Sequence, residues 1–150
     1  MRIDIKGVEE CADHRPEWEK LFTGYVNFYH REMTPAISNQ VWDWLLDPGH
    51  ELQGVMAFAG GQPAGLAHYR AMPRPMAGSY IGFLDDLFVD PVWRGRQVAR
   101  HLLDHLAQTA RSKGWESVRW LTGDDNYAAR SLYDQVARKT MFNLYEMKTG

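Results

Sequence analysis

Residues 85–100 read DDLFVDPVWRGRQVAR, and this stretch decides the fold. An apolar strand ends at Val89, Pro91 stops it, and a long amphipathic helix begins at about Gln97. Apolar side chains recur on one face of residues 97–113, and Gly114 follows as a helix terminator. A strand that turns within a few residues into a helix predicts sheet and helices in one layered fold.

The flanking segments extend this pattern in both directions. Downstream, we expect a strand at 118–121, a helix at 126–136 and a closing strand at 141–147. Upstream, we expect a strand at 2–5, a helix at 16–31, a second helix capped by Ser38, and strands at 52–59, 64–69 and 80–89. This order, without repeats or linkers, predicts one mixed α/β domain over residues 1–150.

Composition narrows the class of protein. The chain has 150 residues, 45% hydrophobic and 24% charged, as in ordinary globular domains. A net charge of −2 argues against a nucleic-acid partner held by phosphate attraction. The single cysteine, Cys11, fits a reducing compartment. Because the first residues lack the apolar core of a signal peptide and no apolar run approaches about 20 residues, we expect a cytoplasmic protein with no membrane partner.

A local cluster of arginines stands out against this near-neutral background. Arg94, Arg96 and Arg100 lie in the loop and first helical turn, with no acidic residue between Pro91 and Arg100. Free backbone N–H groups, the helix dipole and guanidinium groups together can bind phosphate. A solvated basic loop is the alternative interpretation. The sequences GxxxxGK[ST] and GxGxxG are absent, which excludes the common nucleotide loops.

Two motifs in this order resemble those of the GNAT family of N-acetyltransferases. Val89-Asp90-Pro91 and residues 94–99 are similar to the family's pyrophosphate loop, and residues 126–133, NYAARSLY, are similar to its Asn-x-x-Ala-x-x-x-Tyr helix. The resemblance implies a central, mostly antiparallel, twisted sheet of six to seven strands flanked by about four helices. It also implies acetyl-CoA as co-substrate, a small-molecule amine as acceptor, and a possible homodimer.

The resemblance also assigns residues to acetyl-CoA. The pyrophosphate would lie on the loop, and the pantetheine arm would pair with the main chain of Leu87, Phe88 and Val89 and with Asn126. The family usually has a glycine where this chain has Gln97, a departure that bears on affinity. The implied loop residues are Arg94, Gly95, Arg96, Gln97, Val98, Ala99 and Arg100.

Acetyl transfer to an amine needs a base, an acid and a donor for the carbonyl oxygen, because the amine is an ammonium ion near neutral pH. By resemblance, the acid is Tyr133, and the donor is the backbone N–H of Phe88 or Val89. Residues 84–89, LDDLFV, resemble the Leu-Glu-Asp-Phe-Phe-Val strand of diamine and thialysine N-acetyltransferases.

That strand makes Asp85 the expected base, with Asp86 as the alternative. Strand alternation places the two carboxylates on opposite faces of the sheet, and a bulge would change which of them faces the site. The other interpretation of both residues is that they neutralise nearby arginines.

Two rival functions remain open at this point: acetylation of lysine or N-terminal amines in a protein, and non-catalytic binding of acyl-CoA.

We predict no metal site. His101 and His105 are four residues apart on a helix, but they share its polar face and no third ligand is evident.

Overall fold

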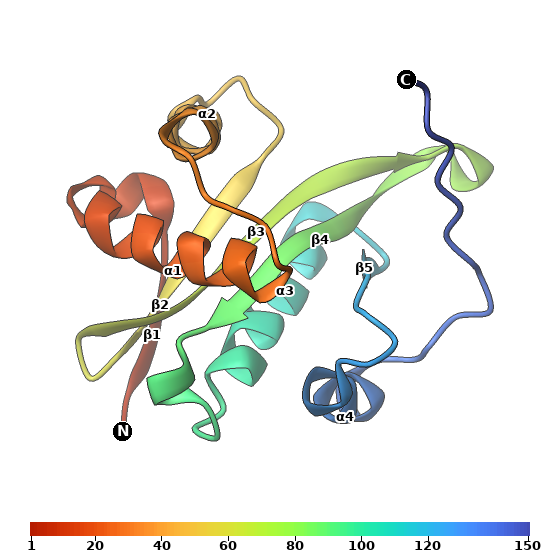
Figure 1. Cartoon of the computed structure of the whole chain (residues 1–150). Coiled ribbons are helices and arrows are strands. Elements are labelled where there is room, and N and C mark those ends of the chain that lie inside the picture. The colour runs from red at the N-terminus through yellow and green to blue at the C-terminus, as the bar shows by residue number, and fades with distance from the viewer.

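The computed structural model describes residues 1–150 and contains one five-stranded sheet in the order β1-β2-β3-β4-β5 (Figure 1). The first four strands pair antiparallel, and β5 runs parallel to β4. The mixed α/β class is confirmed, but the sheet is smaller than the expected six to seven strands. The strands are β1 Ile3–Gly7, β2 Gln53–Ala59, β3 Gln62–Arg74, β4 Ser79–Val89 and β5 Val118–Trp120.

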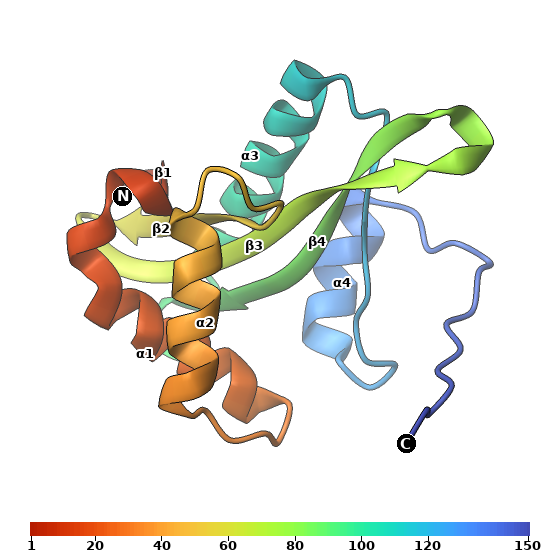
Figure 2. The same cartoon turned by 90° about the horizontal axis from the view of Figure 1, so that it is seen from above.

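Helices cover both faces of the sheet (Figure 2). On one face, α1 (Arg15–Phe28) and α2 (Pro35–Leu46) enclose a core that includes Trp18 and Trp42. On the other face lie α3 (Val98–Lys113) and α4 (Tyr127–Val136). The apolar stripe of α3 is buried as its periodicity predicts. Short 3-10 turns span Val8–Glu10, Ala12–His14, Pro75–Ala77 and Pro91–Trp93.

The structure corrects two expected elements. Thr34, not Ser38, caps α2: its hydroxyl accepts a hydrogen bond from the Ile37 backbone N–H, and Pro35 occupies the first turn. Residues 141–147 are not a strand, because they pair with no neighbouring strand and an isolated strand has no ladder. Their large apolar side chains are exposed instead, namely Met141, Phe142, Leu144, Tyr145 and Met147.

A bulge interrupts the pairing of β3 with β4. His68 lies opposite Asp86 and Tyr69 lies opposite Leu84, so Asp85 has no partner on β3. One extra residue on a strand breaks the strict alternation of side chains between the two faces. The bulge therefore falls at the position where the sequence predicts the catalytic base.

Candidate active site

A cavity of about 530 Å³ opens where β4 and β5 diverge. The two strands pair only over Gly82–Leu84 and Val118–Trp120, and beyond this point no strand pairs with β4 on its β5 side. One wall comes from β4 and the loop after it, and the opposite wall comes from the segment after β5 and from α4. The end of α1 closes the cavity on the other face of the sheet through Tyr25, Phe28 and Tyr29.

This cavity gathers most of the residues that the sequence assigns to the site. Two of them, Asp86 and Arg96, do not line it. The predicted residues in its wall are Asp85, Leu87, Phe88, Val89, Arg94, Gly95, Gln97, Val98, Ala99, Arg100, Asn126 and Tyr133. Segments separated by a helix and a strand in the sequence thus meet around one space.

The loop before α3 carries an uninterrupted run of free hydrogen-bond donors. The backbone N–H groups of residues 95–100 donate no hydrogen bond within the chain, and the first helical bond is from the His101 N–H to the Gln97 carbonyl. Arg94, Arg96 and Arg100 form no ion pair in the chain. Free donors at a helix N-terminus, beside guanidinium groups that form no ion pair, fit a diphosphate.

Gln97 adopts the left-handed conformation that glycine favours, with φ of 65° and ψ of 21°. A side chain in this region costs about 1–2 kcal/mol, which explains why a glycine suits this position. The side chain makes no capping hydrogen bond that would offset the strain.

We expect Gln97→Gly to raise the midpoint of thermal unfolding by a few degrees, because relief of the strain exceeds the added chain entropy of glycine. The affinity for coenzyme A should hold or increase, as measured by calorimetry. Arg96→Gly is the matched control, since Arg96 lies in the same loop without a positive φ. A lower midpoint for Gln97→Gly than for Arg96→Gly would contradict the strain argument.

The hydrogen-bond ladder distinguishes between the two candidate donors for the carbonyl oxygen. The Asp90 N–H donates to the Ala64 carbonyl on β3. Because bonding alternates along an antiparallel pair, the Phe88 N–H also points to β3, and the Val89 N–H points to the side that β5 has left. The geometry favours Val89 as the oxygen donor.

Tyr133 lies on α4 against the cavity, with its ring edge-on to Trp120 at 5.3 Å between centroids. Burial raises the pKa of Tyr133 to about 12, and the nearby Tyr29 adds to this effect. The phenol is therefore protonated throughout the neutral range. A protonated phenol beside a cavity can supply a proton to a departing thiolate.

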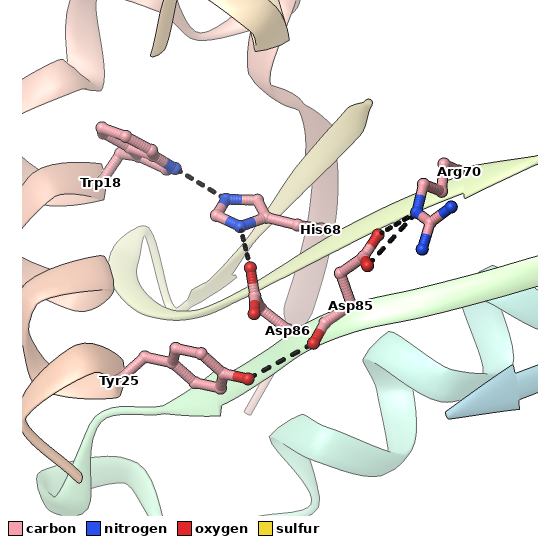
Figure 3. Close-up of polar contacts among 6 residues, drawn as sticks. All are labelled: Trp18, Tyr25, His68, Arg70, Asp85 and Asp86. Atoms are coloured by element: carbon pink, nitrogen blue, oxygen red, sulfur yellow. Dashed lines mark hydrogen bonds and ion pairs between the residues drawn. The ribbon is translucent and has the colours of Figure 1, made fainter. Parts of the chain in front are cut away.

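The bulge places Asp85 and Asp86 on the same face of the sheet, which corrects the expectation of opposite faces (Figure 3). Asp85 accepts hydrogen bonds from Arg70 Nε at 3.0 and 3.2 Å, whereas Asp86 bonds to His68 at 2.8 Å. Burial raises the pKa of Asp85, although Arg70 opposes this effect. Of the two carboxylates, only Asp85 lines the cavity.

Asp86 belongs to a hydrogen-bonded chain that leads into the core (Figure 3). The Trp18 indole N–H donates to Nε2 of the fully buried His68 at 3.0 Å. An indole nitrogen only donates, so Nε2 carries no proton and Nδ1–H must donate to Asp86. His68 is thus a neutral imidazole in one tautomer, held between α1 and β4.

The sequence predicts the aromatic wall on α1 only in part. Helical spacing marks Tyr25 and Tyr29 as core or pocket-wall residues, but nothing local places them near Asp85. In the structure the Tyr25 hydroxyl donates to the Asp85 carbonyl at 3.3 Å. Burial raises the pKa of Tyr25 well above its usual range, and the Asp86 charge adds to the shift. The helix comes this close because Gly24 leaves room for the Phe88 ring, which would lie 2.8 Å from a Cβ there.

His68 and Arg70 carry no motif in the sequence, and their part in the site emerges only from the pairing of β3 with β4. The one available signal is that they are two residues apart, which places them on one face of a strand.

No group of three or more His, Cys, Asp or Glu side chains could hold a metal ion. None of the helices combines the length and apolar character that crossing a bilayer requires.

Comparison with known proteins relates this arrangement to one family. Residues 13–137 match the model of the acetyltransferase (GNAT) family. The chain is 30% identical over 147 residues to the D-amino-acid N-acetyltransferase of Saccharomyces cerevisiae, covering 97% of this chain and 90% of that protein. It is 35% identical over 120 residues to the thialysine N-epsilon-acetyltransferase of Caenorhabditis elegans, covering 80% and 68% of the two chains.

Solved structures share the fold at lower sequence identity. AAC(6')-Iy in complex with a bisubstrate analogue, CoA-S-monomethyl-acetylneamine, superposes with a TM-score of 0.84 at 19% identity over the full length of both chains. The ribosomal-protein-alanine N-acetyltransferase of Brucella melitensis biovar Abortus 2308 superposes with a TM-score of 0.82 at 21% identity, covering 99% of this chain and 100% of that one.

Proposed function

Because this chain belongs to the acetyltransferase (GNAT) family, we propose that it transfers an acetyl group from acetyl-CoA to the primary amine of a small molecule. The two curated relatives are named for small acceptors, a D-amino acid and thialysine. Residues 1–150 would act as a single catalytic domain. The observation that carries the proposal is the cavity that joins the free N–H groups of residues 95–100 to Asp85 and Tyr133.

The residues of the cavity suit each requirement of the reaction. The free amides of residues 95–100, with Arg94, Arg96 and Arg100, would hold the diphosphate of coenzyme A. Leu87, Phe88 and Val89 lie where the pantetheine arm would run, and Asn126 faces them from the start of α4. The Val89 N–H would donate to the acetyl oxygen, and this hydrogen bond would strengthen as negative charge develops there.

Asp85 and Tyr133 would handle the protons. Asp85 would accept a proton from the ammonium group of the acceptor, directly or through water, because its carboxylate lines the cavity. Tyr133 would donate its phenolic proton to the sulfur of the leaving thiolate. Asp86 would have a supporting part, because its carboxylate bonds to His68 and does not line the cavity.

A transfer assay and a binding measurement together test the proposal. Release of free thiol from acetyl-CoA, followed over a panel of amines, amino acids and peptides, should show turnover with small amines. Calorimetry should show that coenzyme A binds, and Arg94→Gln with Arg100→Gln should weaken this binding by about tenfold or more. Binding without turnover on any acceptor would favour a non-catalytic binding domain, and absence of binding would overturn the proposal.

The stability of the protein should depend on the ionisation of Tyr133. Its pKa is about 12 in the folded chain against an ordinary value of 10.0. Between these values the unfolded chain loses a proton that the folded chain keeps, so the free energy of unfolding should fall as the pH rises from about 10 to about 12. Urea unfolding at several alkaline pH values would measure the slope. Tyr133→Phe should make it shallower, and an unchanged slope would contradict the shift.

Two further features belong to the same proposal. A cytoplasmic location is supported by the buried thiol of Cys11, the only cysteine, which suits a reducing compartment.

Homodimer formation is supported by the exposed apolar side chains of residues 141–147, since monomers seldom expose such clusters. Light scattering should then report twice the mass of one chain, and truncation after residue 138 should lower it.

A further inference from the structure

In the ion pair between Arg70 and Asp85, one edge of the Arg70 guanidinium group has no hydrogen-bond partner. Arg70 reaches the Asp85 carboxylate only through Nε, and its two terminal nitrogens form no hydrogen bond within the chain. About a third of the Arg70 side chain is exposed, at 32%, and the Asp85 side chain is 27% exposed. The guanidinium is steadied by the Phe83 ring, which lies 5.0 Å from it. A planar donor with a free edge is thus fixed next to Asp85 (Figure 3), which lines the cavity although Arg70 itself does not.

The position of this ion pair determines which groups of a bound acceptor the free edge of the Arg70 guanidinium can contact. Asp85 lines the cavity, and Arg70 Nε lies 3.0 Å from one of its oxygens. Any acceptor whose ammonium group meets Asp85 therefore has its neighbouring atoms close to the guanidinium. Free guanidinium N–H groups match the two oxygens of a carboxylate in a planar fork.

A molecule with an ammonium and a carboxylate on the same carbon fits both charges at once. Its carboxylate would bind the terminal nitrogens of Arg70, and its ammonium would lie against Asp85. The four charges would then alternate in sign, which is favourable in a partly buried site. A simple amine would leave the guanidinium edge unmatched.

The third substituent of such a molecule would meet aromatic rings. Tyr25 and Tyr29 lie edge-to-face at 5.1 Å between centroids, and Phe28 packs edge-on to Tyr29 at 5.2 Å. All three residues line the cavity from the end of α1. A wall of this kind favours an apolar or aromatic side chain.

We propose that the acceptor is a free α-amino acid with an apolar side chain, and that Arg70 is the residue that binds its carboxylate. This inference rests on the proposed function and specifies its substrate class. The ammonium group loses one proton to Asp85, and the freed nitrogen forms a bond to the acetyl carbon. The C–S bond breaks, and the sulfur takes a proton from Tyr133. The nitrogen loses its second proton through water to the Tyr133 phenolate, so the products are the N-acetyl amino acid and free coenzyme A.

Matched acceptor pairs test the inference directly. Phenylalanine and leucine, each as the D and L forms, would be compared with phenethylamine and isopentylamine, which lack only the carboxylate. We expect kcat/KM of the wild type to favour at least one amino acid over its amine by about tenfold or more. Arg70→Gln should remove that preference, chiefly by raising KM for the amino acid, because glutamine can still donate hydrogen bonds but lacks the charge and the planar fork of the guanidinium group.

Arg74→Gln is the matched control variant. Arg74 lies on the same strand but pairs with Glu116 at 2.7 Å, and Glu116, unlike Asp85, does not line the cavity. The ratio of the two kcat/KM values should therefore stay at the wild-type level. The ratio is the decisive quantity, because loss of Arg70 also changes the environment of Asp85 and can lower both rates.

The outcomes separate this inference from the function on which it rests. Acetylation of the amines with equal or greater efficiency would overturn the role of Arg70 and leave the acetyltransferase intact. If Arg70→Gln lowers kcat/KM equally for the amino acid and for the amine, the role of Arg70 in binding the carboxylate is also overturned. Such a result would show that the substitution acts only through Asp85. No thiol release with any acceptor, despite binding of coenzyme A, would overturn the proposed function and this inference together.

Discussion

Replacement of Tyr133 by phenylalanine should lower kcat by about 10²–10³-fold while the dissociation constant of coenzyme A changes by less than about threefold. The substitution removes one hydroxyl that forms no hydrogen bond within the chain, so the packing against Trp120 should persist. In the proposed mechanism, the variant lacks the proton for the leaving sulfur. The raised pKa of Tyr133 keeps that proton in place in the wild type at all neutral pH values.

The matched control for this experiment lies on the same helix. Tyr127 begins α4, is 74% exposed and does not line the cavity. Tyr127→Phe should therefore retain kcat within about twofold. Single-turnover measurements would show whether the chemical step itself has slowed. If Tyr133→Phe retains more than about half of the wild-type kcat, another group protonates the sulfur and the assignment of the acid is wrong.

The second large effect concerns stability, and we expect His68→Ala to lower the free energy of unfolding by about 3 kcal/mol. The substitution opens a void at a fully buried position and removes the partner of two polar groups, the Trp18 indole N–H and the Asp86 carboxylate. Urea denaturation would measure the loss. For a domain of this size, the thermal midpoint should fall by roughly 10 °C.

A surface histidine and a double mutant test the cause of that loss. His101 is exposed on α3, and His101→Ala should cost less than about 1 kcal/mol. Trp18→Phe combined with His68→Ala should cost less than the sum of the two single losses, because the variants share one hydrogen bond. Strict additivity, or a His68→Ala loss below about 1 kcal/mol, would show that the network does not hold the fold together.

The parts of the site that the sequence could predict are those set by local chemistry. Helix α3 begins and ends within a residue of its predicted bounds, because apolar periodicity and Gly114 are local signals. The donors before it follow from the same signals, since any helix N-terminus has unpaired N–H groups. Gln97 is the local exception, a non-glycine residue in a conformation that glycine favours.

The parts that could not be predicted depend on pairing between distant strands. The position of the bulge follows from the register of β3 on β4, and no residue near Asp85 encodes that register. For the same reason the partners of the two carboxylates, Arg70 and His68, could not be read from the sequence. The predicted strand at 141–147 is wrong for a related reason. Its local pattern favours a strand, but no strand of the sheet pairs with it.

The divergence of β4 from β5 leaves an unsaturated strand edge inside the molecule rather than on its rim. Exposed edges invite association with other proteins and promote aggregation. Here α4 and the segment after β5 form the opposite wall of the cavity, so the edge faces the cavity. A slender ligand with amide groups of its own, as we propose for the pantetheine arm, would pair with this edge from within the cavity. The unpaired backbone groups of β4 are thereby directed to a ligand inside the cavity and away from the strands of other proteins.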